Sequence, residues 1–228
     1  MKHPPAHAVA AGSRAVATAS FDPDCRRCTR LAKFCRATAE EYPGYHAAPV
    51  PAFGDARPHW LIVGLAPGMH GANRTGRPFT GDHAGIVLYE TLHALGVSSA
   101  PQSLSHDDGL RLRGVRITNA VKCLPPANKP LPAEIRTCNA FLQAELAALA
   151  RVRVIVALGR IAHDAVLDAL GLPRGAFKFG HAAEHVLADG RLLIDSYHCS
   201  RYNTQTRRLT REMFHAVLAR AQSVAGSA

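Results

Sequence analysis

The sequence predicts an α/β protein, a three-layer α/β/α sandwich with a central four-stranded, mostly parallel sheet. Short apolar segments, of which Trp60–Gly64 and Val154–Leu158 are unbroken, are typical of strands that are buried on both faces. Between them lie segments whose apolar residues recur every three or four positions, as in amphipathic helices. Because 47% of the 228 residues are hydrophobic and 19% are charged, a chain that is disordered or fibrous throughout is excluded.

The start of the chain differs in composition from the rest. Residues 1–20 are rich in alanine and show neither strand nor helix periodicity, so we expect a disordered tail there. Residues 21–228 are expected to form a single domain that begins with a cysteine-bearing arm. Within this arm we predict a short helix in Asp24–Ala39, followed by a loop at Tyr42–Pro58.

Strands and helices alternate after the arm. The predicted strands are Trp60–Gly64, Val115–Val121, Val152–Leu158 and Arg191–Asp195. The predicted helices are Gly85–Leu95, Glu134–Ala150, Arg160–Leu170 and a last one from about Thr210. Such alternation favours parallel strands with helices on both faces. In sheets of this kind the ligand sits at the carboxyl ends of the strands, so the loops there are the candidate site.

The charge of the chain predicts a polyanionic partner. The 27 Lys and Arg residues exceed the 17 Asp and Glu residues by ten, which gives a net charge of +10. Nucleic acid is favoured over a membrane surface because no basic amphipathic segment stands out. The alternative is a basic surface without a partner. No apolar run reaches the roughly 20 residues of a membrane-spanning helix.

Six cysteines are too few for a disulfide scaffold, and Met1–Ser20 lacks the apolar run of a signal peptide, so we expect a cytoplasmic protein with reduced thiols. A Cys-x2-Cys pair and two distant cysteines form a candidate metal-ligand set. The set is Cys25, Cys28, Cys123 and Cys138. Zinc and an iron–sulfur cluster both accept four thiolates, and the alternative is that the cysteines are small buried hydrophobes. Cys35 and Cys199 are left outside the set.

A nineteen-residue, glycine-rich loop, Gly64–Asp82, follows the first predicted strand. Its glycines let backbone N–H groups approach a ligand closely. Its polar residues that could meet an anion are His70, Asn73, Arg74, Thr75 and Arg77. The loop matches neither the Walker A nor the GxGxxG pattern, which disfavours the common nucleotide-phosphate sites. Loops of this length in compact domains are usually functional or disordered, so we favour a function over an ordinary surface loop.

A second polar segment, His198–Thr210, follows the last predicted strand. It is dense in hydroxyl, amide and guanidinium groups, which suit contacts to phosphodiesters. Because it also lies at the carboxyl end of a strand, we expect it beside the glycine-rich loop.

Together these residues resemble a known family. The motifs are Gly64-Leu65-Ala66-Pro67-Gly68, Gly76-Arg77-Pro78-Phe79-Thr80-Gly81-Asp82, Asn119-Ala120-Val121-Lys122-Cys123, His198-x-Ser200, Asn203-Thr204 and Arg208-Leu209-Thr210, with the four cysteines. In this order they are similar to the bacterial and archaeal uracil-DNA glycosylases with an iron–sulfur cluster, and most similar to the family 5, or type b, branch. The resemblance covers roughly Cys25 to Gln222.

The resemblance implies a single α/β/α domain, a structural [4Fe–4S] cluster on the four cysteines, and hydrolysis of the N-glycosidic bond of a deaminated base in DNA. Related branches carry an acid soon after the first glycine of the loop, where this chain has Leu65 and Ala66. The resemblance therefore assigns the water-positioning carboxylate to Asp82. A salt-bridging, structural aspartate is the alternative.

The other roles also follow from the resemblance. His198 would donate to the base O2, Asn119 would pair with uracil O4 and N3–H, and Phe79 would stack on the flipped base. Each has a structural alternative: a capping or core histidine, a strand amide, and a core aromatic. Further substrate-binding residues are Gly64, Ala66 and Gly68, and the expected DNA contacts are His70, Asn73, Arg74, Ser200, Asn203 and Thr204.

The sequence thus predicts a monomeric, monofunctional glycosylase that releases uracil, and other deaminated bases such as hypoxanthine, and leaves an abasic site. A non-catalytic iron–sulfur or zinc DNA-binding module is the main alternative. A metal-dependent nuclease is disfavoured because clustered carboxylates are missing from the motifs.

Overall fold

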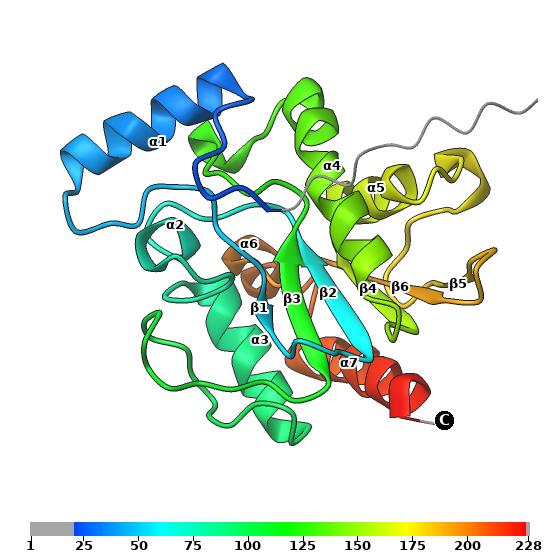
Figure 1. Cartoon of the computed structure of the whole chain (residues 1–228). Helices are drawn as coiled ribbons and strands as arrows, with labels where there is room; N and C mark the ends of the chain where they lie inside the picture. Colours follow the sequence, from blue (N-terminus) through cyan, green and yellow to red (C-terminus); the bar gives the residue numbers. More distant parts are fainter. Residues whose placement is uncertain (1–20, 227–228) are drawn as a thin grey trace, which may run out of the picture.

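A six-stranded sheet lies at the centre of the computed structural model, which describes residues 21–226 (Figure 1). The strand order is β1-β3-β2-β4-β6-β5. The strands are β1 (Phe53–Gly54), β2 (Trp60–Gly64), β3 (Val115–Asn119), β4 (Val154–Leu158), β5 (Glu184–Val186) and β6 (Leu192–Ser196). The tail predicted at residues 1–20 lies outside the described residues.

The four inner strands are those that the sequence predicts, and they are parallel to one another. β1 and β5 are antiparallel edge strands of two and three residues, which the prediction of a four-stranded sheet missed. Strands this short are hard to recognise because they show too little alternation. The α/β class with a mostly parallel sheet is confirmed, and its strand number is corrected.

Helices cover both faces of the sheet. The α-helices are α1 (Thr29–Glu41), α2 (Ala72–Thr75), α3 (His83–Ala94), α4 (Pro132–Ala148), α5 (Arg160–Ala169), α6 (Arg201–Gln205) and α7 (Arg211–Gly226), and two 3₁₀ turns are η1 (Pro126–Asn128) and η2 (Arg174–Ala176). α3 and α7 lie on one face, and α4 and α5 lie on the other (Figure 1). The short helices α2 and α6 were not predicted. No helix within residues 21–226 is long and apolar enough to cross a bilayer.

Alternation along β2 explains how one strand serves two cores. Trp60 and Ile62 contribute to the core beneath α3 and α7, whereas Leu61 and Val63 contribute to the core beneath α4 and α5. Successive strand residues point to opposite faces, so a strand between two helical layers must be apolar throughout. This is why an unbroken apolar segment predicted β2, and likewise β4.

The cysteine-bearing arm packs beside α4. Leu31 and Cys35 of α1 share a third apolar cluster with Cys123 and Cys138. At the edge of this cluster, Arg30 forms an ion pair of 2.6 Å with Glu134.

The inner strands place four loops at one edge of the sheet because parallel strands share a direction. Gly64 ends β2 and Asn119 ends β3. Gly159 follows β4, and His198 follows β6. Segments that are far apart in the sequence therefore meet at the carboxyl edge.

Candidate active site

A cavity of about 470 Å³ opens at the carboxyl edge of the sheet. The loops after all four inner strands line it, as expected for a parallel sheet. The predicted site residues in its lining are Ala66, Gly68, Phe79, Asp82, Asn119, His198 and Ser200. The structure therefore brings together the three residues predicted for the chemistry and the aromatic predicted to stack on the base.

Gly64 lets the aromatic and the amide of the cavity approach the end of β2. A Cβ atom on Gly64 would lie 2.4 Å from Asn119 Oδ1 and 2.6 Å from Phe79 Cζ, which is closer than real contacts allow. Phe79 itself has a positive φ of 54°. Such a conformation is strained for an aromatic residue. The glycine and the strained turn together set Phe79 and Asn119 side by side.

Asn119 has a side-chain atom without a hydrogen-bond partner among the described residues. The residue is buried at the end of β3, and among residues 21–226 its Oδ1 has no hydrogen-bond partner. Leaving a buried polar atom unpaired costs roughly 1–3 kcal/mol, so such an atom in a cavity wall is suited to a ligand donor.

Asp82 is held at the N-cap of α3. Its Oδ1 accepts the backbone N–H of Gly85 at 2.9 Å. Its Oδ2 lies against the glycine-rich loop, since Cβ atoms on Gly71 and Gly68 would lie 2.2 Å and 3.2 Å from it. No described residue donates a hydrogen bond to Oδ2. One oxygen therefore fixes the side chain, and the other is available at the cavity.

His198 lies opposite Asp82, and its surroundings favour the neutral imidazole. Burial lowers the pKa of His198, and the negative charge of Asp82 only partly opposes this effect. Asn203 Nδ2 donates to the carbonyl oxygen of His198 at 2.8 Å and so holds its backbone. The rings of His198 and Phe79 are 5.9 Å apart between centroids and inclined by 25°. The imidazole plane is thus nearly parallel to the aromatic plane.

Two of the residues expected at DNA are exposed beside the cavity. Arg74 is exposed on the glycine-rich loop and reaches the carbonyl of Gly81 at 3.4 Å. His70 is exposed, and its Nδ1 is hydrogen-bonded to the hydroxyl of Tyr45 at 2.9 Å. Both positions are compatible with the predicted phosphate contacts.

The predicted DNA contacts at α6, namely Ser200, Asn203 and Thr204, are half-buried and already form hydrogen bonds within the protein. Ser200 caps the helix by accepting the N–H of Asn203, and Thr204 Oγ1 lies 2.8 Å from His83 Nε2. Ser200 and Thr204 can still turn a polar atom toward DNA, whereas the amide of Asn203 is engaged with the carbonyl of His198. The structure thus gives Asn203 a positioning contact that the sequence did not predict.

Two predicted anion contacts are wrong. Asn73 is 0% exposed, and both polar atoms of its amide are buried without a partner among the described residues. Arg77 is also buried, where it pairs with Asp108 at 2.6 Å and donates to Ser103. Burial raises the pKa of Asp108, but the Arg77 hydrogen bond and three backbone donors lower it overall to about 2. Arg77 therefore ties the glycine-rich loop to Ser103 and Asp108, and both buried side chains point away from where a phosphate could lie.

Three residues of the cavity region were missed by the sequence analysis. Arg160 at the start of α5 and Arg201 at the start of α6 both line the cavity. Tyr202, next to Arg201, is 70% exposed. Arginines that begin a helix after a sheet strand were a usable signal, whereas the exposure of an aromatic cannot be read from sequence.

The four cysteines of the predicted ligand set line a second, small cavity beside α1 and α4. Burial raises the pKa of Cys138 to about 11, and the backbone N–H of Lys122 donates to its sulfur at 3.2 Å. Cys35 lies outside this cavity but shares a hydrogen bond with Cys123. The four predicted cysteines thus share one cavity, and Cys35 lies beside it.

The spacing of the cysteine sulfurs differs from that of a single-ion site. Within residues 21–226, the group whose ligand atoms all lie within 4.8 Å of one another is His163, His185 and Asp195, and no three cysteines meet this spacing. His163 Nδ1 lies 2.8 Å from Asp195 Oδ1, which is a hydrogen-bond distance.

Comparison with known proteins identifies the family. The family model described as the uracil DNA glycosylase superfamily matches residues 51–222. The chain belongs to this superfamily. The match includes the glycine-rich loop, β3 and the His198–Thr210 segment, and it begins after α1. The prediction of an enzyme of this class is confirmed.

Curated relatives define the branch within the uracil DNA glycosylase superfamily. A type-5 uracil-DNA glycosylase of Thermus thermophilus is 53% identical over 211 residues, which cover 89% of this chain and 94% of the relative. A type-5 uracil-DNA glycosylase of Pyrobaculum aerophilum is 46% identical over 208 residues, 89% of this chain and 90% of the relative. A type-4 enzyme of the same organism is 37% identical over 137 residues, 60% of this chain and 61% of the relative. The resemblance to the family 5 branch is confirmed.

Proposed function

We propose that this protein hydrolyses the N-glycosidic bond of uracil in DNA and leaves an abasic site. The observation that carries the proposal is one cavity that holds an aromatic face, an amide with an unpaired oxygen, a neutral imidazole and a carboxylate. These groups meet the needs of a flipped base, its leaving electron pair and a cationic sugar.

The ring geometry supports the placement of the base. A base stacked on Phe79 lies parallel to that ring, and the imidazole of His198 is within 25° of the same plane. The N–H of His198 is therefore directed within about 25° of the base plane, the direction in which a carbonyl oxygen accepts best. The two rings, 5.9 Å apart, leave less than the about 7 Å that a base between them would need, so the base lies beside His198.

Asn119 supports selection of deaminated bases. Its Oδ1 would accept from N3–H of uracil, and its Nδ2 would donate to O4. Cytosine offers the opposite pattern, a donor at position 4 and an acceptor at position 3. Hypoxanthine presents a carbonyl beside an N–H, as uracil does, so the same amide would pair with it. We therefore include hypoxanthine among the substrates.

The proposed reaction separates charge, and the cavity compensates for it at both ends. As the C1′–N bond breaks, its electrons move to the base, and His198 N–H stabilises the negative charge at O2. The sugar becomes an oxocarbenium-like cation, which Asp82 Oδ2 stabilises. Asp82 also orients a water molecule, whose oxygen bonds to C1′ and whose proton passes through the carboxylate to the base anion. No residue forms a covalent intermediate.

The surface beside the cavity supports DNA binding. The net charge of +10 and the exposed Arg74 would hold the DNA backbone. Tyr202, exposed next to the cavity residue Arg201, would fill the gap that a flipped nucleotide leaves in the stack. The protein would act as a monomer in the cytosol, where thiolate ligands stay reduced.

The donor set fits a [4Fe–4S] cluster held by Cys25, Cys28, Cys123 and Cys138. A tetrahedral zinc ion would hold its sulfurs about 3.8 Å apart, given a Zn–S bond of about 2.3 Å. Among the described residues no three of these sulfurs lie within 4.8 Å of one another, so their spacing does not match a single zinc ion. Its contribution would be structural, since it would tie the arm before α1 to β3 and α4.

The test uses the purified protein on end-labelled duplexes with one central uracil, one hypoxanthine or no damage, followed by alkali and gel separation. We expect alkali-dependent cleavage at uracil and hypoxanthine, and none in the undamaged duplex. Asn119→Leu should reduce excision of uracil while the cluster absorbance stays unchanged. A cluster-loaded protein that binds all three duplexes equally and cleaves none would instead be the non-catalytic DNA-binding module.

A further inference from the structure

Two arginines beside the active-site cavity lie on aromatic rings. The guanidinium carbon of Arg160 is 5.4 Å from the ring centre of Phe179, and that of Arg208 is 4.6 Å from the ring centre of Tyr197. The rings of Phe179 and Tyr197 are 6.3 Å apart, and His181 stacks on Tyr197 at 5.1 Å. We call these five residues the stacked-arginine ridge. Both rings thus form cation–π contacts with an arginine.

A buried ion pair fixes the backbone that carries this ridge. His163 Nδ1 lies 2.8 Å from Asp195 Oδ1, and its Nε2 lies 3.0 Å from the carbonyl oxygen of Phe177. Both partners are acceptors, so both ring nitrogens must carry protons and His163 is an imidazolium. Asp195 Oδ2 also accepts from Gly180 N–H at 3.4 Å and faces His185 at the same distance. The backbone on both sides of Phe179 is thereby tied to the core.

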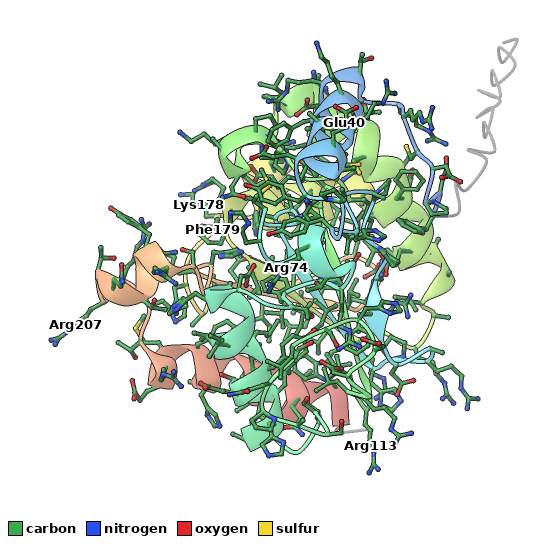
Figure 2. All side chains as sticks on the ribbon, turned by 90° about the vertical axis from the view of Figure 1, so that its left-hand side faces the viewer. Glu40, Arg74, Arg113, Lys178, Phe179 and Arg207 are labelled. Carbon is green, nitrogen blue, oxygen red and sulfur yellow. The ribbon has the colours of Figure 1, made fainter. Side chains whose placement is uncertain are left out.

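The surroundings of the ridge are basic. Residues 177–183 and 196–211 contain no Asp or Glu. Their cations are Lys178, Arg201, Arg207, Arg208 and Arg211. In Figure 2, the labelled side chains of Lys178 and Arg207 extend outward on the same side of the molecule, and Arg113 extends from the lower end. The basic surface is continuous with the cavity through Arg160, which belongs to both.

We propose that the stacked-arginine ridge binds the phosphodiester backbone of duplex DNA beside the nucleotide held in the cavity. An arginine supported on a ring loses less freedom when it binds, and its N–H fork remains available to a phosphate. This proposal rests on the proposed function, because that function brings DNA to the adjoining cavity. The ligand chemistry is the phosphate backbone, so the contact is independent of DNA sequence.

The test measures binding of the full chain to an undamaged fluorescent duplex by anisotropy at several salt concentrations. Arg208→Gln should raise the Kd several-fold and reduce the slope of log K against log salt by about 0.9, the value of one phosphate contact. Tyr197→Leu keeps the charge, so it should raise the Kd and leave the slope unchanged. The matched control is Arg113→Gln, because Arg113 is exposed just before β3, at the opposite edge of the sheet.

Uracil excision by the unaltered protein is measured in parallel, so that two failures can be told apart. Suppose that the unaltered protein excises uracil, and that Arg208→Gln has the same Kd and the same salt slope as Arg113→Gln. The ridge proposal is then overturned, and the proposed function stands. If the salt slope of Arg208→Gln falls by the amount expected for one phosphate contact and the unaltered protein excises no uracil, the ridge is supported and the proposed function fails. Should Tyr197→Leu fail to fold, the Arg208→Gln comparison still decides.

Discussion

Asp82 combines a helix cap with a negative charge, and two substitutions separate these contributions. Its Oδ1 accepts the N–H of Gly85 at 2.9 Å, while its Oδ2 lies near Gly71 at the cavity. Asp82→Asn keeps an oxygen for the cap and removes the charge. Asp82→Ala removes both.

The two changes predict different patterns. Loss of an N-cap costs about 1 kcal/mol, which lowers the Tm of a domain of this size by about 2–4 °C. A carboxylate that acts on the reacting water contributes roughly 10²–10⁴ in rate. Both variants should therefore excise uracil at least about 100-fold more slowly. Asp82→Ala alone should also melt at a lower temperature.

The rate is measured in single turnover, with enzyme in excess over an end-labelled uracil duplex, and the Tm by circular dichroism. Asp107→Asn is the control, because Asp107 is exposed and lies outside the cavity lining. An Asp82→Asn variant that excises uracil at nearly the unaltered rate would refute the role of the charge. An unchanged Tm for Asp82→Ala would refute the role of the cap.

Three further predictions concern packing, pH and the cluster. Gly64→Ala would push a Cβ to within 2.4 Å of the amide oxygen beside it, so excision should fall about 100-fold, whereas Gly44→Ala, with nothing within 4 Å, should be neutral in the same single-turnover assay. Because the folded pKa of Asp108 is about 2, below its ordinary 3.8, its ionised form stabilises the fold above pH 4 and this contribution is lost as pH falls toward 2. Because Asp108 is exposed, solvent screening reduces the contribution of its charge, so Asp108→Asn should cost only about 1 kcal/mol in urea unfolding at pH 7 and less at pH 3, and an equal cost at both would contradict this. Cys138→Ser should lose the iron and the brown colour, whereas Cys199→Ser, outside the ligand set, should keep both; iron analysis that finds no difference would reject the set.

Much of the fold could be predicted from the sequence, because burial of a strand on both faces requires apolar residues. The inner strands β2 and β4 could be predicted because each is apolar on both faces, as Leu61 and Ile62 show in β2, and β3 and β6 because they hold short apolar segments between predicted helices. The edge strands β1 and β5 could not, because two or three residues give no periodicity. The convergence of Asn119 and His198 on one cavity followed from the rule that parallel strands end at one edge.

Other parts of the site depend on where side chains point, which the sequence does not show. Asn73 and Arg77 are polar residues of a glycine-rich loop, and nothing in their identity shows that they point inward. They are buried because the loop folds back into the short helix α2 and because Arg77 pairs with Asp108. The contacts of Arg160 and Arg208 with aromatic rings likewise depend on where their side chains point.

Hydrolysis of the bond between uracil and deoxyribose yields free uracil and an intact abasic strand. Both products can be quantified by mass spectrometry after incubation with a uracil duplex and before alkali. We expect equal amounts of the two products and no broken strand. Bound DNA without free uracil, or strands broken before alkali, would show that the cavity does not perform this hydrolysis.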